Sequence, residues 1–181
     1  HKCGNPPKTV YTCIDTEIHA GYDGRVYLLD TSRTFPPQSP PDPALPQAYL
    51  YQLMRPEFVL AYKEALCSDA HSPFIAECDK EMVNSRATAA TKYLFEKVIP
   101  DFAFEFADAV FFETAHGKLT NFSLKQILHS RGINLRHLGK VYTALSIVPQ
   151  THRYMEQVIH NCRTLCVIEM VARTITAHIG T

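Results

Sequence analysis

Half of the prolines in this chain are concentrated in one short stretch. Of 12 prolines among 181 residues, six lie between Pro36 and Pro46. Because proline fixes φ and removes a backbone donor, neither a helix nor a central strand can continue through this stretch. We therefore expect an extended, polyproline II-like strap over residues 35–46 that runs across the surface. Its PxxP spacing leaves a second interpretation open, a ligand for an SH3-type domain.

The segment before the strap has the pattern of β structure. Residues 10–14 are β-branched and aromatic, and two apolar runs flank the turn sequence 21–24. Both central residues of a type I′ turn need positive φ, so the pair Asp23-Gly24 indicates a hairpin over residues 18–30. The sequence therefore predicts a small antiparallel β unit over residues 9–34.

The segment after the strap, residues 47–180, is predicted to be a helical body. Ser123 with Gln126, Gly132 and Asn134 are helix-capping signals, and Pro100 is expected to end a helix. Residues 101–112 also alternate in polarity, so a strand is an alternative there. The last helix is expected to bury a stripe of apolar residues. The predicted helices cover residues 57–66, 87–98, 101–112, 124–131, 135–145 and 152–178. The stripe comprises Met155, Val158, Ile159, Cys162, Leu165, Cys166, Ala172 and Ile175.

Length and composition favour a single α+β domain over residues 1–181, mostly α. The chain is 46% hydrophobic, which is enough to build a core, and its 18 basic and 18 acidic residues give no net charge. A neutral chain has no global field that would attract nucleic acid.

No apolar run is long enough to span a bilayer, so we expect no membrane insertion. Six cysteines without a CxxC pair favour a reducing compartment, with disulfides as the alternative. The chain lacks an initiator Met and a signal peptide, and we interpret it as a piece of a larger protein.

Two stretches carry a family resemblance. HAGYDGRVYLLDTSRTFPP, residues 19–37, and LKQILHSRGINLRHLGKV, residues 124–141, resemble the central region of the clustered-mitochondria (CLU) family. Between them, YLYQLMRPEFVLAY and TKYLFEKVIPDF are similar to two further segments of that region, in the same order. The resemblance covers residues 17 to 145.

The resemblance implies a non-catalytic interaction or scaffold module. CLU proteins are large cytoplasmic proteins needed for normal mitochondrial distribution, and they associate with messenger RNAs and ribosomes. Some members were described as a component of translation initiation factor 3. The expected partner is accordingly a protein or a ribonucleoprotein. The ubiquitin-like part and the tetratricopeptide array of full-length members are missing from this chain.

A basic cluster around the GINLRHLG sequence is the candidate partner or RNA site. It lies on two predicted short helices, where it would form either a contact for RNA or a solvated face. Tyr142 is near enough in sequence to stack on a base. Asn134 also suits a structural role, as a helix N-cap. The candidate residues are Lys125, Arg131, Asn134, Arg136, His137 and Lys140, with His129 beside them.

The hairpin signature comprises a second group, Asp23, Gly24, Arg25, Asp30 and Arg33, which we expect to be structural. Asp30 and Arg33 have the spacing of a buried ion pair. A hairpin that ends in LLD before a helical body also resembles the C-terminal lobe of a kinase. A degenerate kinase-like lobe with residual nucleotide binding at Asp30 is therefore an alternative, and a direct RNA-binding domain is another.

Catalytic and metal motifs are missing from the sequence. There is no HExxH, no G-x-S-x-G and no kinase lysine, DFG or HRD signature. His129 with Cys162 or Cys166 has no spacing typical of zinc sites. We therefore predict no enzyme activity, no cofactor and no metal. The sequence leaves the oligomeric state undetermined.

Overall fold

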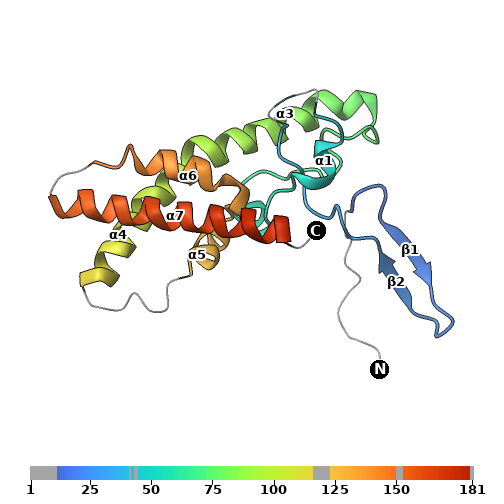
Figure 1. Ribbon diagram of the computed structural model, residues 1–181. Helices are drawn as coiled ribbons and strands as arrows, with labels where there is room; N and C mark the ends of the chain where they lie inside the picture. The colour runs from blue at the N-terminus through green and yellow to red at the C-terminus, as the bar shows by residue number, and fades with distance from the viewer. Residues whose placement is uncertain (1–11, 41, 43–44, 116–122, 150–152, 180–181) are drawn as a thin grey trace, which may run out of the picture. The chain divides into compact units, whose positions relative to one another are not determined.

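The computed structural model describes residues 12–40, 42, 45–115, 123–149 and 153–179. Within this part of the chain a two-stranded hairpin is followed by helices, which confirms an α+β fold that is mostly helical (Figure 1). The chain divides into two compact units, His1–Leu53 with Glu64–Ala87 and Met54–Lys63 with Thr88–Thr181. That the two units fold as one domain stays a prediction. Among the described residues, no helix has the length and apolar character needed to cross a membrane.

The predicted hairpin of the first unit is present. Strands β1 (Glu17–Ala20) and β2 (Val26–Leu29) pair antiparallel, with Ile18 opposite Leu28 and Ala20 opposite Val26. The predicted type I′ turn is wrong, because among the turn residues 21–24 only Gly24 has positive φ, at 75°. The Gly24 amide donates to the Gly21 carbonyl, so the connection is longer than two residues.

The turn is held by Asp23, whose carboxylate accepts hydrogen bonds from the Arg25 amide and the Tyr27 hydroxyl. These bonds lower the pKa of Asp23, with the Tyr27 bond as the larger cause. Asp23, Gly24 and Arg25 therefore shape the turn, as expected. The expected strand over residues 10–14 is not seen in its described part, residues 12–14, and residues 10 and 11 lie outside the described residues.

Arg33 anchors the first unit, but not through the predicted ion pair with Asp30. Its side chain is 2% exposed, and its guanidinium donates to both Asp15 oxygens, at 2.7 and 2.8 Å, and to Asp69 at 2.9 Å. The guanidinium also lies over the Tyr49 and Phe74 rings. The hydrogen bonds from Arg33 hold the pKa of Asp15 down, at about 2.

Asp30 was expected in that pair and lies elsewhere. It is exposed and has a positive φ of 50°, and its carboxylate accepts from the Ser32 hydroxyl at 2.7 Å. The carboxylate also accepts from the Ser32 amide at 3.4 Å, a local backbone bond that is common for an aspartate in the left-handed region. Asp30 therefore shapes the turn of the chain after β2, and Arg33 pairs with carboxylates that are farther away in the sequence, those of Asp15 and Asp69.

The start of the proline-rich strap is buried rather than laid across the surface. Pro36, Pro37 and Gln38 are buried. Pro37 forms an isolated antiparallel β-bridge with Leu53, and the Gln38 amide donates to the Gln52 carbonyl at 2.8 Å. The PxxP pair that begins at Pro37 is thus not displayed as a ligand, and the two pairs that include residue 43 lie outside the described residues. The helix that follows the strap, α1 (Ala48–Tyr51), was not predicted.

A continuous helical run supplies much of the second unit. It begins in α3 (Glu77–Tyr93), which belongs to the first unit as far as Ala87, and continues through the π-helical turn η1 (Leu94–Val98) into α4 (Ile99–Ala115). Our expectation that a helix ends before Pro100 is wrong. A π-turn widens the helix and Pro100 falls in the first turn of α4, where its missing N–H is tolerated.

The strand alternative for residues 101–112 is also wrong. Phe102, Phe106 and Val110 are buried along one face of α4, with helical spacing. The Phe102 and Phe106 rings stack with their centroids 5.5 Å apart. Helix α2 (Pro56–Ala61) begins at its proline as expected but ends earlier than residue 66, because the backbone at Tyr62 is extended.

The two capped helices were correctly predicted. In α5 (Leu124–Ser130) the Ser123 hydroxyl accepts from the Gln126 amide. After it, Gly132 has a φ of 71°, and the amides of residues 132 and 133 close the helix by donating to the carbonyls of residues 129 and 128. This is the Schellman arrangement. Asn134 then caps the 3₁₀ turn η3 (Leu135–His137), which continues into α6 (Leu138–Leu145).

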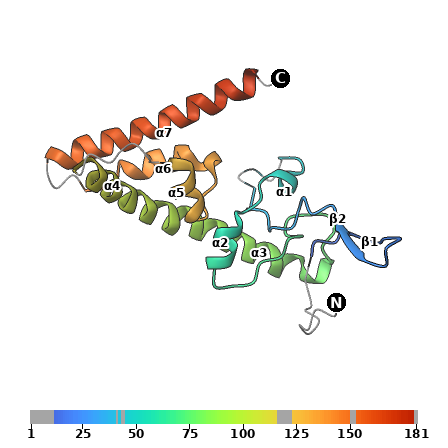
Figure 2. The same ribbon diagram turned by 90° about the horizontal axis from the view of Figure 1, so that it is seen from below.

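Helix α7 (Arg153–Ile179) packs against α4 and α6. Val158, Ile159, Cys162 and Cys166 are buried, as predicted. Of the rest of the predicted stripe, Met155 and Leu165 are half-buried, whereas Ala172 and Ile175 are exposed, as are all residues from 171 to 179. Figures 1 and 2 show the last turns of α7 reaching past α6.

Candidate interaction surface

The predicted basic cluster is spread over sites of different character. Arg131 is half-exposed and forms an ion pair of 2.6 Å with Glu105 of α4. Asn134 uses its side-chain oxygen to cap η3, accepting from the Arg136 amide at 3.1 Å. Lys125 and Arg136 are exposed. The candidate residues therefore lie in different environments, and their joint role as a partner or RNA site stays a prediction.

His137 is in the core and not on the surface. It is 7% exposed, and its ring meets the edge of Phe95 at 5.1 Å between centroids. Burial, and then the charges of Arg136 and Lys140, lowers its pKa to about 4. The ring is neutral at pH 7 and cannot supply a cation to an RNA phosphate. Lys140 lies over the same Phe95 ring, 4.3 Å from its centroid.

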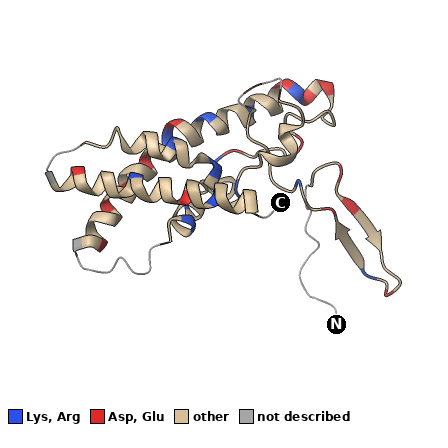
Figure 3. Ribbon diagram, viewed as in Figure 1, with Lys and Arg blue, Asp and Glu red and all other residues tan. Residues whose placement is uncertain are grey.

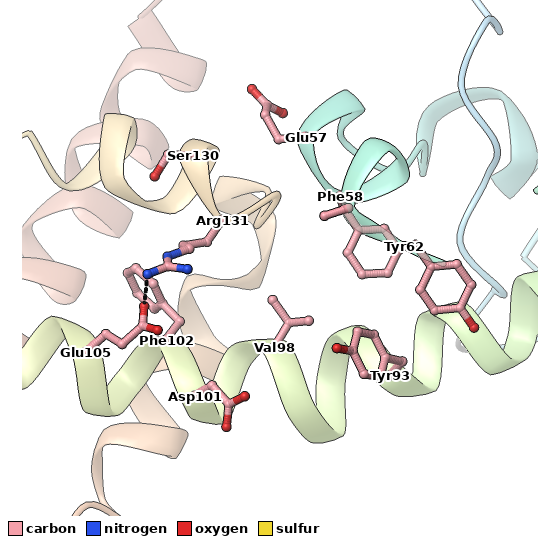
Figure 4. A pocket seen from close by; sticks show the side chains of 11 residues that line it. Glu57, Phe58, Tyr62, Tyr93, Val98, Asp101, Phe102, Glu105, Ser130 and Arg131 are labelled. Carbon is pink, nitrogen blue, oxygen red and sulfur yellow. Dashed lines mark ion pairs between the residues drawn. The ribbon is translucent and has the colours of Figure 1, made fainter. Parts of the chain in front are cut away.

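A cleft of about 250 Å³ lies in the second unit (Figure 4). One side is aromatic, with Phe58 stacked on Tyr62 at 5.5 Å and Tyr62 beside Tyr93 at 5.6 Å. The other side is formed by α4 and the end of α5, where Arg131 pairs with Glu105 (Figure 4).

Gly132 sets the distance between α2 and the end of α5. A Cβ at this position would lie 2.5 Å from the Phe58 backbone nitrogen, so no larger residue fits. The positive φ of the residue gives a second reason for glycine. The conspicuous glycine of GINLRHLG is thus explained by packing and backbone geometry.

The charges that line the cleft are already paired. Glu57 accepts two hydrogen bonds from Arg55, at 2.7 and 2.8 Å, which hold the pKa of its carboxyl down. Lys97 donates to Asp101 at 3.0 Å. Figure 3 shows both basic and acidic positions on the helical ribbon, and two such pairs lie one turn apart, Lys92 with Glu96 and Lys97 with Asp101. The cleft can receive a partner's side chain, but it offers no unbalanced charge that would select an ion.

The hydroxyl of Ser130 and the thiols of Cys162 and Cys166 in the second unit are in environments that do not favour nucleophilic chemistry. The Ser130 hydroxyl at the cleft donates to the Ile127 carbonyl of its own helix. Burial raises the pKa of Cys162 to about 12 and that of Cys166 to about 11, so both thiols stay protonated at neutral pH. Among the described residues, no three histidine, cysteine or acidic side chains gather where they could hold a metal ion.

A groove of about 280 Å³ runs between α6 and α7. Arg163 of α7 donates to the Tyr142 hydroxyl at 2.6 Å, and its guanidinium lies over the Tyr142 ring, 4.1 Å from the centroid. Its Nε is buried and has no hydrogen-bond partner among the described residues. Val167 and Ile168 continue the lining of this groove along α7.

Beyond the groove, α7 displays an exposed apolar row. We call Val167, Ile168, Val171, Ile175 and Ile179 the outer row; their exposed fractions range from 41% to 79%. At about 100° per residue, the row lies roughly 170° around the helix from the buried residues 158, 159, 162 and 166. Apolar spacing along α7 predicted a single buried stripe and missed this surface, because spacing alone does not say which face of the helix each residue occupies.

Two family models match parts of the chain. The model described as clustered mitochondria matches residues 1–40, which include the hairpin. The model described as translation initiation factor eIF3 subunit 135 matches residues 119–180, which include α5, α6 and α7. Neither match reaches half of the chain, although together they include both stretches that carry the resemblance in the sequence. No curated protein and no solved structure matches.

Proposed function

We propose that this chain is a non-catalytic interaction module of a CLU-like protein, and that it docks a protein partner in the cytoplasm. In this proposal the module serves mitochondrial distribution and the association of that protein with messenger RNA and ribosomes. The two partial matches, to the clustered-mitochondria and eIF3 subunit 135 models, support this setting.

The observation that carries the proposal is the outer row. Its residues lie on the face of α7 that turns away from the core, and the row falls within the part of the chain that matches the translation factor subunit. Contiguous exposed apolar side chains of this kind mark protein interaction sites. Binding a partner there would remove this surface from water, which favours association.

The non-catalytic part of the proposal rests on the state of the reactive groups. The Ser130 hydroxyl is engaged by its own helix, the two buried thiols of α7 are protonated, and His137 is enclosed against Phe95. Asp30, on which the kinase-like alternative depends, is exposed and bonded to Ser32. Direct RNA binding is weakened by the burial of His137 and the ion pair of Arg131.

The proposal can be tested by sedimentation of the tagged chain in a eukaryotic cytoplasmic extract, with and without ribonuclease. We expect the chain to enter a larger complex in both conditions. The double variant Ile168→Gln with Ile175→Gln should sediment as free chain. Leu60→Gln is the matched control, because Leu60 is 87% exposed on α2 and lies outside the outer row.

Two results would contradict the proposal. A wild-type chain that sediments alone in both conditions would exclude a stable partner. A complex that ribonuclease dissolves, and that Lys125→Gln with Lys140→Gln prevents from forming, would assign the chain to direct RNA binding instead.

A further inference from the structure

We infer that the outer row and the adjoining Tyr142–Arg163 groove bind one amphipathic helix of a partner protein, and that an acidic side chain of this helix pairs with Arg163. The inference rests on the proposed function and specifies its partner. Its two supports are the spacing of the apolar residues and the unpaired charge beside them.

The spacing of the outer row suits a helical partner. Ile168, Val171, Ile175 and Ile179 follow one another at intervals of three, four and four residues, the pattern of a helix–helix seam. From residue 167 to residue 179 the row is about 18 Å long, at about 1.5 Å per residue. A partner helix of three to four turns would cover it, with its own apolar residues at the same intervals.

The groove is continuous with the row. Val167 and Ile168 line the groove together with Tyr142 and Arg163, and both also belong to the outer row. A helix laid along the row would therefore reach the groove at its end, where the apolar surface changes to a cationic and aromatic one. This places the polar contact at one end of the interface and fixes the direction and register of the partner.

Charge complementarity selects the acidic partner. Among the described residues Arg163 has no carboxylate partner; its guanidinium donates to the Tyr142 hydroxyl, and its Nε is buried without an acceptor. The stacking on Tyr142 holds the planar group in a fixed orientation. A carboxylate is the acceptor whose geometry matches such a guanidinium. An RNA strand would need several cations along the row, which is apolar.

The test is a selection from a displayed library of helical peptides of about 20 residues. The library varies the apolar positions and allows acidic, basic or neutral residues elsewhere, and the whole chain is the target. We expect the selected peptides to carry apolar residues at intervals of three and four and an enriched Glu or Asp at one position. Their affinities are then measured by fluorescence anisotropy.

Variants of the chain assign the contacts. We expect Arg163→Gln to weaken binding about tenfold, and Ile168→Gln with Ile175→Gln to weaken it further, while Leu60→Gln leaves it unchanged. A peptide with Gln in place of its enriched acid should lose the same tenfold, and Arg163→Gln should weaken that peptide no more, which shows direct coupling. Far-UV circular dichroism of each variant shows that it is folded.

Several outcomes would overturn the inference. These are a selection that yields no helical peptide, peptides that bind regardless of Arg163, and an outer row that drives the chain to self-associate in analytical ultracentrifugation. If the extract complex depends on the outer row but the selected helices ignore Arg163, the inference fails and the proposed function stands. If the extract complex does not form at all, the proposed function fails as well.

Discussion

The two halves of α7 carry similar side chains and behave differently. Ile159 and Cys162 in the first half are 3% and 0% exposed, whereas Ile168 and Ile175 in the second half are 58% and 52% exposed. Both halves have high apolar content and helical spacing. The first half packs against α4 and α6, and the second half continues past α6 (Figure 2).

The difference lies in the face that the apolar residues occupy. After Cys166 the positions that would continue the buried stripe are taken by Glu169, Arg173 and Thr176, while the isoleucines move to the opposite side. Apolar periodicity therefore indicates a helix, but the direction in which it points decides between core and interface. A stripe that changes face within one helix indicates two packing partners.

The largest expected effect compares one substitution in both halves. Ile159→Ala should lower the free energy of unfolding by about 2–5 kcal/mol, because it removes buried methyl groups and leaves a cavity. Ile175→Ala should change it by no more than about 0.5 kcal/mol, as is usual for exposed positions. Urea denaturation of both variants measures the contrast.

An equal loss of stability in the two variants would break the comparison. It would mean that Ile175 is covered by another part of the same chain in solution, and the outer row would then belong to the core. A larger loss for Ile159→Ala alone leaves the outer row free for a partner.

The second expected effect concerns the same contrast between buried and exposed side chains, here at the buried His137. Its pKa is lowered to about 4 by burial, so the folded chain resists protonation where the unfolded chain accepts a proton. The stability that this residue contributes is complete above pH 6.5 and is lost as the pH falls toward 4, by about 3 kcal/mol in all. Urea denaturation between pH 7 and pH 4 should therefore show a shallower loss for His137→Gln than for the wild-type chain.

The control variant is His160→Gln, which removes an exposed histidine of α7 instead of the buried one. A slope unchanged by His137→Gln would show that the ring is solvated in solution, and would return His137 to the candidate surface residues.

Local signals predicted much of the fold, because each acts within a few residues. The Asp23-Gly24 turn, the Ser123 and Asn134 caps and the positive φ of Gly132 were found in this way. The helix through Pro100 was missed, because a π-turn admits the proline and depends on how the neighbouring turns pack. The ion partners of Arg33 were missed for a related reason, since Asp69 is 36 residues away in sequence.

The candidate site was less predictable than the fold. A list of basic residues does not reveal that His137 is enclosed by Phe95 or that Arg131 reaches Glu105 on another helix. The outer row was within reach of the sequence, because a helical projection of residues 158–179 separates its residues from the buried ones. The groove at Tyr142 could not be predicted from the sequence, because it forms only where α6 lies beside α7.

The smallest expected effect concerns the Arg131–Glu105 ion pair, which extends the contrast between buried and exposed groups to charges. The two side chains are 55% and 48% exposed, so solvent screens their attraction and conformational freedom is lost in forming the pair. A double-mutant cycle with Arg131→Gln and Glu105→Gln should give a coupling within about 1 kcal/mol, smaller still at high salt. If the coupling exceeds this and resists salt, the cleft is closed to water in solution and Arg131 acts as a structural residue. A small, salt-sensitive coupling means that the pair can open at little cost, so that Arg131 and the aromatic wall of the cleft remain accessible to a second contact of the same partner.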